Sequence, residues 1–233
     1  MTEELFRSDS YLRECDATVV AVDDHAVTVD RTVFYPLGGG QPGDTGTMSW
    51  ESGETAIIDT RYGPDGSVVH LVEEGSALPG VNDTLHLSLD WDRRYRHMRM
   101  HTAMHLLGSI LQYGVTGGNI SEQKSRLDFD MEDTVDKEAV TAALQELVAA
   151  DHPVSFRWVS DAELDAKPEL VRTMSVQPPR GKGKVRLLEI EGVDLQPCGG
   201  THLKSTAEVG AVRIGKVEKK GKRNRRVNIH LDD

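Results

Sequence analysis

Residues 93–113 (RRYRHMRMHTAMHLLGSILQY) have the residue spacing of an amphipathic α-helix. The apolar residues that recur at helical intervals and predict a buried stripe are Met98, Met104, Leu107 and Leu111. His101 and His105 are four residues apart, so both imidazoles project from one face about one turn from each other. Asp90 or Asp92 is a suitable N-cap, and Gly114 is expected to end the helix. The stretch therefore predicts a core helix that can supply two ligands to a metal ion.

A second pair of ligands follows in residues 196–202 (QPCGGTH), where Cys198 and His202 are again four residues apart. The two glycines between them let the backbone bend around an ion. Zinc takes imidazole and thiolate ligands at tetrahedral angles. The two pairs together predict one zinc site per chain. A nucleophilic Cys198 activated by histidine is the alternative that the residues leave open. Cys15 is expected to be an ordinary thiol.

His97 extends the helix pair into a ladder of three histidines at four-residue intervals. The outer two lie about 12 Å apart along the axis, too far for one ion with bonds of about 2 Å. Only one adjacent pair can therefore bind, and spacing alone does not choose between them. Thr102 stands where the metallopeptidase motif H-E-x-x-H needs its glutamate, so peptide hydrolysis is excluded.

Charge is divided unevenly along the 233 residues. Residues 1–89 hold 16 acidic and 4 basic residues, whereas residues 90–233 hold 22 acidic and 23 basic ones, so the net charge of −11 comes from the first part. Two basic clusters lie in the second part, residues 216–226 (KVEKKGKRNRR) and the helix arginines Arg93, Arg94, Arg96 and Arg99. These clusters could bind a polyanion such as nucleic acid. The alternative is that both are simply solvent-exposed surfaces.

The pattern predicts two domains with a boundary between residues 89 and 90. The first has short β-like runs separated by turns, including a hairpin formed by residues 18–22 and 26–29, and is expected to be a small antiparallel β-barrel or sandwich. The second mixes strands and helices without a βαβ repeat and is expected to be α+β. In it, residues 116–119 are expected to form a glycine turn and residues 171–183 a loop. Without an apolar run of about 18 residues or a secretory leader, a cytoplasmic protein with no membrane partner is expected.

Residues 34–46 (FYPLGGGQPGDTG) contain three consecutive glycines. Their high entropy cost suggests that the backbone needs positive φ or close approach to another group. The motif lacks the Gly-Lys-Ser/Thr ending of a phosphate-binding loop, so no nucleotide cofactor is expected. A tight surface turn is the simpler alternative.

The three motifs HTAMHLL (residues 101–107), QPCGGTH and FYPLGGGQPGDTG resemble the editing half of alanyl-tRNA synthetases and the free-standing AlaX alanyl-tRNA editing proteins. The resemblance covers nearly the whole chain, which is too short to add an adenylate-forming domain and so resembles the medium-length form. It implies an N-terminal β-barrel followed by an α+β editing domain shared with threonyl-tRNA synthetases. It also implies hydrolysis of mischarged tRNA(Ala), chiefly the seryl and also the glycyl ester.

The same resemblance implies a role for each motif residue. The implied ligands of one Zn²⁺ are His101, His105, Cys198 and His202, which leaves out His97. Gln41 is implied to reach the editing pocket, with backbone access given by Gly38, Gly39 and Gly40, and Thr116 is expected to sense the serine hydroxyl. Met104 departs from the HTATH of alanyl-tRNA synthetases and is interpreted as a core residue. The expected tRNA contacts are Arg93, Lys222, Arg223 and Arg225.

Zinc in such a site could polarise the ester carbonyl, activate water or anchor the amino group of the substrate. Four protein ligands are, however, typical of structural zinc. We therefore expect one ligand to be dispensable for metal binding but not for turnover. An RNA-binding module with a purely structural zinc, or a hydrolase of another small acyl ester, are the alternatives. A monomer is expected.

Overall fold

The computed structural model describes residues 1–166, 171 and 184–232, so residues 172–183 of the loop expected at 171–183 lie outside the described residues. Contacts divide the chain into two compact units, Met1–Tyr95 and Arg96–Asp233. The domain boundary between residues 89 and 90 stays a prediction. In the described part of the chain, no helix is long and apolar enough to cross a membrane.

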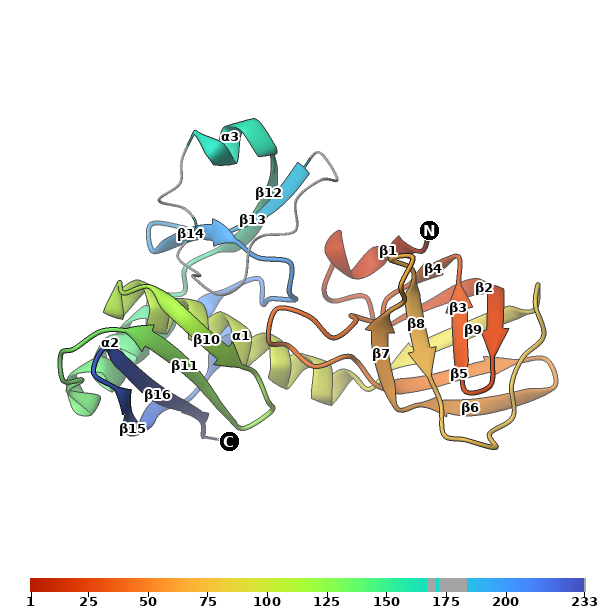
Figure 1. Cartoon of the computed structure of the whole chain (residues 1–233), viewed down its shortest axis with the longest axis horizontal. Coiled ribbons are helices and arrows are strands. Elements are labelled where there is room, and N and C mark those ends of the chain that lie inside the picture. The colour runs from red at the N-terminus through yellow and green to blue at the C-terminus, as the bar shows by residue number, and fades with distance from the viewer. Residues whose placement is uncertain (167–170, 172–183, 233) are drawn as a thin grey trace. The chain divides into compact units, whose positions relative to one another are not determined.

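The first unit is built from short antiparallel strands (Figure 1). They are β2 (Glu14–Asp23), β3 (Ala26–Val29), β5 (Gly46–Trp50), β6 (Gly53–Ile57), β7 (Asp59–Tyr62), β8 (Val68–Leu71) and β9 (Thr84–Leu89). They form one sheet in the order β6-β5-β9-β2-β3-β8-β7. A parallel pair, β1 (Glu3–Glu4) and β4 (Arg31–Thr32), and the 3₁₀ helix η1 (Leu5–Arg7) complete the unit.

Strand β2 joins the two halves of this sheet. Its residues 14–18 pair with β9, whereas its residues 19–23 pair with β3, as in the predicted hairpin. Its alternating pattern turns Ala17 and Val19 inward, where they pack with Phe34, Met48 and other apolar residues of the first unit. One long strand thus lets both halves share a hydrophobic core.

The predicted barrel is not confirmed, because the sheet is open. A closed barrel requires hydrogen bonds between the first and last strands of the order. In the described residues, the edge strands β6 and β7 do not pair with each other. They are successive segments separated only by Ile58, whose amide donates to Leu71 O at 2.8 Å. The chain therefore changes partner at Ile58, from β5 to β8, and no ladder joins β6 to β7 among the described strands.

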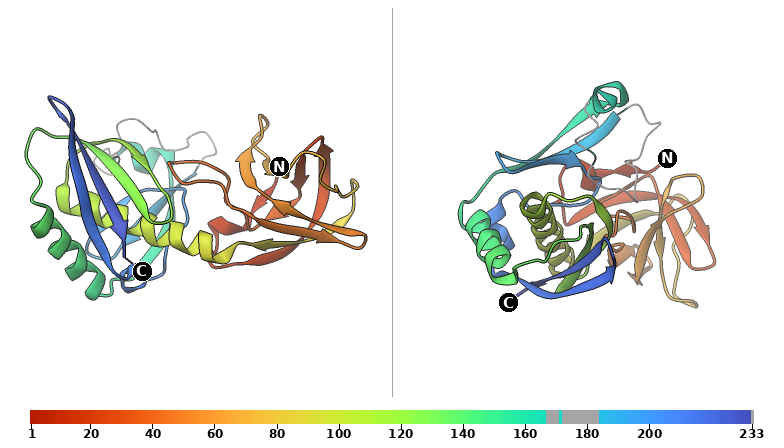
Figure 2. Two further views of the ribbon diagram at one scale, coloured as in Figure 1. Left: turned by 90° about the horizontal axis from the view of Figure 1, so that it is seen from below. Right: turned by 60° about the vertical axis from the view of Figure 1, so that its left-hand side comes forward.

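The second unit is α+β, as predicted. Its elements are α1 (Trp91–Leu111), which begins in the first unit, β10 (Val115–Asn119), β11 (Lys124–Asp130), α2 (Lys137–Ala149), β12 (Val154–Ser160), α3 (Asp161–Asp165), β13 (Lys184–Ile190), β14 (Asp194–Pro197), η3 (Thr206–Val209), β15 (Val212–Gly221) and β16 (Asn224–Leu231). One antiparallel sheet has the order β10-β11-β16-β15, and another has the order β12-β13-β14. Helices α1 and α2 pack against the four-stranded sheet (Figure 2).

The ends of α1 confirm one cap and correct the other. Asp90 accepts a hydrogen bond from the Arg93 amide at 3.2 Å, as expected of an N-cap. Gly114 does not end the helix: the last helical residue is Leu111, and Gln112 turns the chain at a φ of 54°. Gly114 instead accepts from the Asp130 amide at 2.8 Å, where the next strand begins.

The glycine turn expected at residues 116–119 is wrong, because this segment belongs to β10. It pairs with β11 over four positions, with an irregularity between Val115 and Gly117. A Cβ at Gly118 would come within 3.1 Å of Leu127 Cδ2 and 3.5 Å of Met104 Cε. Glycine therefore allows the strand to lie close to α1, and Met104 is a buried core residue.

Candidate metal centre

Three histidines and one cysteine of the second unit converge at the predicted site. Helix α1 supplies His101 and His105, and the loop after β14 supplies Cys198 and His202. One ligand atom from each residue lies within 4.8 Å of the others. Cys198 Sγ is 3.1 Å from His202 Nε2 and 3.5 Å from His101 Nε2. These four residues, called the quartet below, have the donor types and the geometry to hold a metal ion.

The surroundings of Cys198 and His202 favour the protonation states in which these two residues bind a metal. Burial alone would raise the pKa of the Cys198 thiol, but His101 and His202 beside it lower that pKa well below its ordinary value. Burial and the neighbouring His101 lower the pKa of His202 well below its ordinary value. Because metals bind thiolate and neutral imidazole, both shifts favour coordination.

Asp194 holds the His105 ring. Its Oδ2 lies 3.0 Å from His105 Nδ1 and accepts from Gln196 Nε2 at 2.6 Å. Burial would lower the pKa of His105, but this hydrogen bond and the adjacent Cys198 raise it to about 9. A carboxylate on the outer nitrogen of a histidine orients the ring and makes its inner nitrogen a better ligand. Asp194 and Gln196 were not predicted from the sequence as supports of the site, although their alternation with Cys198 at every second residue is a strand-like signal.

Thr102 positions His202 in a similar way. Its Oγ1 is 3.2 Å from His202 Nδ1 and accepts from the Leu203 amide at 3.3 Å. This contact leaves His202 Nε2 directed at Cys198. Thr102, which replaces the glutamate of a metallopeptidase motif, therefore supports His202 of the Cys198–His202 ligand pair.

Arg186 of β13 fixes the cysteine loop. Its Nη1 donates to Cys198 O at 3.2 Å and to Gly200 O at 2.8 Å, and its own carbonyl accepts from the Cys198 amide at 3.1 Å. The side chain is only 4% exposed. Nothing in the local sequence distinguishes this arginine, because its role depends on the register of the β13–β14 pair, which brings Arg186 beside Cys198.

The comparison with known proteins fits this geometry. Residues 185–228 match the threonyl and alanyl tRNA synthetase second additional domain, and residues 9–93 match class II (A) tRNA synthetases. The chain is 39% identical to the alanyl-tRNA editing protein AlaX-M of Methanosarcina acetivorans over the full length of both proteins. The chain belongs to the AlaX family of alanyl-tRNA editing proteins.

Two further relatives extend the comparison. The AlaX-M protein of Saccharolobus solfataricus is 35% identical over 97% of this AlaX-family chain and 98% of its own length. The alanine–tRNA ligase of Pyrobaculum neutrophilum is 39% identical over 94% of this chain but only 25% of the ligase. The similarity to the ligase is thus confined to a part of that longer protein.

The glycine motif of the family forms a two-residue turn in the first unit. Gly39 and Gly40 have φ of 56° and 83°. Gly38 and Gln41 exchange two backbone hydrogen bonds of 3.1 and 2.9 Å around them. Both central residues need positive φ, which L side chains rarely adopt, so the glycines are explained by the turn itself. Gln41, the last residue of this turn, is completely buried, which a simple surface turn does not require.

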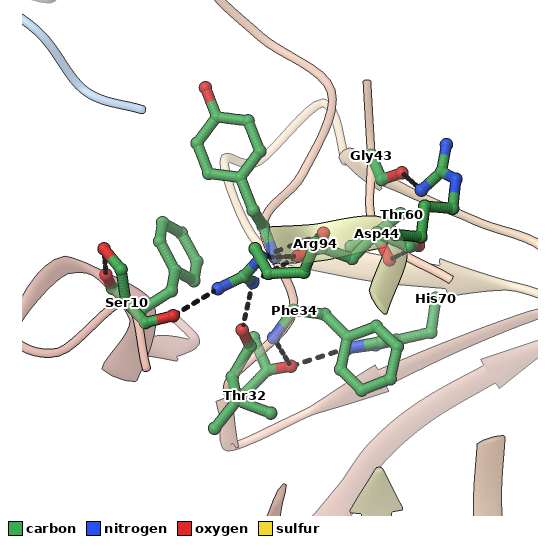
Figure 3. Close-up of polar contacts among 12 residues, drawn as sticks. Ser10, Thr32, Phe34, Gly43, Asp44, Thr60, His70 and Arg94 are labelled. Atoms are coloured by element: carbon green, nitrogen blue, oxygen red, sulfur yellow. Dashed lines mark hydrogen bonds and ion pairs between the residues drawn. The ribbon is translucent and has the colours of Figure 1, made fainter. Parts of the chain in front are cut away.

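A buried ion pair anchors the far side of this motif (Figure 3). Arg94 Nε lies 3.0 and 2.9 Å from the carboxylate oxygens of Asp44, and both side chains are almost fully buried. The remaining guanidinium nitrogens donate to Ser10 O at 3.1 Å and Val33 O at 2.7 Å. Arg94, predicted only as part of a basic cluster, is therefore a structural residue of the first unit.

The hydroxyl of Thr116 is engaged within the four-stranded sheet. It donates to Asp128 O at 3.1 Å and accepts from Asn224 Nδ2 at 3.3 Å. Its expected role in sensing serine stays a prediction.

The predicted tRNA-contact residues differ in how their side chains are used. Arg223 pairs with Asp130 at 3.2 Å, Arg225 is buried and donates to Glu132 O, and Arg93 donates to Gly43 O at 2.7 Å. Lys222 is exposed at the β15–β16 turn. Much of the basic stretch is thus neutralised or used for structure, which a charge count does not reveal.

Proposed function

We propose that this chain is a deacylase that acts in trans on mischarged tRNA(Ala). Its main substrate is seryl-tRNA(Ala), with glycyl-tRNA(Ala) as a second one. The observation that carries the proposal is the convergence of the quartet in a chain that is similar over its full length to AlaX-M proteins. The bond to be hydrolysed is the ester between the amino acid and the 3′-terminal ribose.

The quartet would hold one Zn²⁺, because three imidazoles and a thiol with a lowered pKa fit the preferences of this ion. When bound, zinc supplies Lewis-acid polarisation of the ester carbonyl. The surrounding residues keep the site ordered: Asp194 orients His105, Thr102 orients His202, and Arg186 holds the loop. Because four protein ligands fill a tetrahedral site, we propose that one of them is needed for turnover but not for metal binding.

Selection of serine over alanine would come from hydrogen bonds to the serine hydroxyl. When alanine enters such a pocket, a buried polar group is left without its partner, which discriminates strongly. We propose Gln41 and Thr116 as the sensing residues, with the backbone of Gly38, Gly39 and Gly40 next to the substrate. A carboxamide and a hydroxyl can each form a hydrogen bond with the serine hydroxyl.

The tRNA is proposed to contact Arg93, Lys222, Arg223 and Arg225. Phosphate contacts of this kind make binding weaken steeply with salt. Among the four, Lys222 and Arg223 are exposed and expected to meet phosphate directly, whereas buried Arg225 would act by fixing the hairpin. The chain is proposed to work as a monomer with domains 1–89 and 90–233.

The decisive assay measures release of amino acid from seryl-, glycyl- and alanyl-tRNA(Ala), with and without a chelator. We expect release from the seryl ester, less from the glycyl ester and little from the alanyl ester, with activity lost on chelation and restored by zinc. No release of serine, together with unfolding on chelation, would instead favour an RNA-binding module with a structural zinc. The four-ligand set is the observation that favours this second candidate.

A further inference from the structure

Two large aromatic side chains are exposed on edge strand β12 of the three-stranded sheet. Phe156 is 37% and Trp158 is 45% exposed. They are two residues apart on the strand, so they lie on the same face of the sheet. An exposed tryptophan does not gain the stabilisation that burial of its large apolar ring would give. The position of Trp158 relative to the quartet indicates a function for this exposure.

The strand register places Trp158 in one row with a member of the quartet. Trp158 is opposite Arg186, and the pairing of Leu187 with Pro197 puts Arg186 opposite Cys198. The hydrogen bond from the Cys198 amide to Arg186 O agrees with this register. Trp158 and Cys198 are thus two strand spacings apart, or about 10 Å across the sheet.

The next row confirms which face is involved. Phe156 is opposite Leu188, which is opposite Gln196. The Gln196 carboxamide lies 2.9 Å from His105 Nδ1, so this face is the one that carries the metal centre. The other face is covered, because Val185 and Leu187 pack there against Leu164 of α3.

The chemistry of this face suits a nucleobase. The Arg186 guanidinium stacks on the Phe156 ring, with Cζ 4.3 Å from the ring centroid. Phe156 and Arg186 thereby form a positively charged support beside the Trp158 ring. Aromatic rings and arginine planes are the groups on which proteins stack unpaired bases, and arginine also carries a charge opposite to that of the phosphates between those bases.

We propose that Trp158, supported by Phe156 and Arg186, stacks an unpaired base at the 3′ end of the aminoacyl-tRNA and so positions the ester at the quartet. This inference rests on the proposed function. Trp158 is a positioning residue, since it acts through the base and not on the reacting atoms.

Binding of an uncharged RNA hairpin tests the stacking without any turnover. The probe is an acceptor-stem hairpin ending in single-stranded CCA, compared with the same hairpin with a blunt end. We expect wild type to prefer the CCA end, and Trp158→Ala to weaken binding of that hairpin about tenfold while leaving the blunt one unchanged. Trp158→Phe, which keeps a ring, should stay within about threefold of wild type. Equal binding of both hairpins by wild type, or equal loss in the two variants, would overturn the inference.

Kinetics on seryl-tRNA(Ala) separates this inference from the proposed function. Trp158→Ala should raise KM about tenfold with little change in kcat, and its salt dependence of binding should match wild type. Arg157→Ala, on the same strand but the opposite face, is the charge control. It should change neither the salt slope nor the preference for the CCA end. If wild type prefers the CCA hairpin but hydrolyses no ester, the proposed function is wrong and the stacking inference stands. An unchanged KM in Trp158→Ala, with altered self-association, would identify the patch as a protein contact and overturn the inference alone.

Discussion

The buried Arg94–Asp44 ion pair and the quartet differ in how their polar atoms are paired. In the first unit, each nitrogen of the Arg94 guanidinium meets an oxygen, from Asp44, Ser10 or Val33. In the quartet, the outer nitrogens of His105 and His202 have partners, while the inner donor atoms face one another. A satisfied ion pair needs no ligand, whereas lone pairs directed at a common point indicate that an ion completes the site.

The largest effect is expected from removing one ligand of the quartet. Cys198→Ala should lower deacylation of seryl-tRNA(Ala) by about a hundredfold or more, because even residues outside the ligand shell cost tenfold to a hundredfold in metal sites. Metal content by mass spectrometry and single-turnover rates provide the measurement. Cys15→Ala is the matched control and should retain both metal and activity. If Cys198→Ala kept full activity, the quartet would not be the reaction centre.

Breaking the ion pair of the first unit should affect stability instead. Asp44→Ala leaves the guanidinium of Arg94 buried without its carboxylate, which costs about 3–5 kcal/mol of unfolding free energy. Urea denaturation checks this value. Glu3→Ala, which removes an exposed partner of Arg31, should change stability by less than about 1 kcal/mol. Equal effects of the two substitutions would contradict the structural role of the buried pair.

His70 adds a pH dependence to the first unit. Its Nε2 lies 2.8 Å from Thr32 Oγ1, and burial lowers its pKa to about 4. The unfolded chain takes up this proton near the ordinary value of 6.5, so stability is full above pH 6.5 and falls as the pH drops towards 4. The loss should reach about 2 kcal/mol at pH 5, at roughly 1.4 kcal/mol per pH unit.

Urea denaturation of wild type and His70→Gln at pH 7 and 5 measures this contribution. The variant should lose less stability than wild type between the two values. Exposed His86, whose pKa is raised mainly by its hydrogen bond to Asp16, is the control, because His86→Gln should keep the acid-dependent loss. Identical pH slopes in wild type and His70→Gln would show that His70 is not its source.

The smallest effect on function is expected from Asp194, which supports a ligand of the quartet. Asp194→Asn removes the charge behind His105 but keeps a similar shape. We expect metal affinity to fall about tenfold to a hundredfold, without loss of the fold. Competition with a calibrated chelator measures the affinity, and Asp151→Asn outside the quartet is the control. An unchanged affinity would mean that the Asp194 contact does not tune the ligand.

Local patterns in the sequence predicted two candidate ligand pairs, whereas the family resemblance was needed to choose His101 and His105 over a pair that includes His97. The two i,i+4 pairs each required only knowledge of nearby residues, and α1 was predicted from its apolar spacing. By contrast, Asp194 and Gln196 could be recognised only after β14 had formed and brought them beside His105. The glycines of β10 favour a turn locally, but pairing with β11 made them a strand.

The sequence by itself determined the family, the α+β character of the second part and, through the family resemblance, the quartet. These features depend on residue type and short spacing. Tertiary structure decided that the seven-stranded sheet stays open, that Arg94 and Arg225 are buried supports, and that Trp158 shares a sheet face with Cys198. These features arise from pairing between distant segments, which is set by the packing of the whole unit and not by any local stretch.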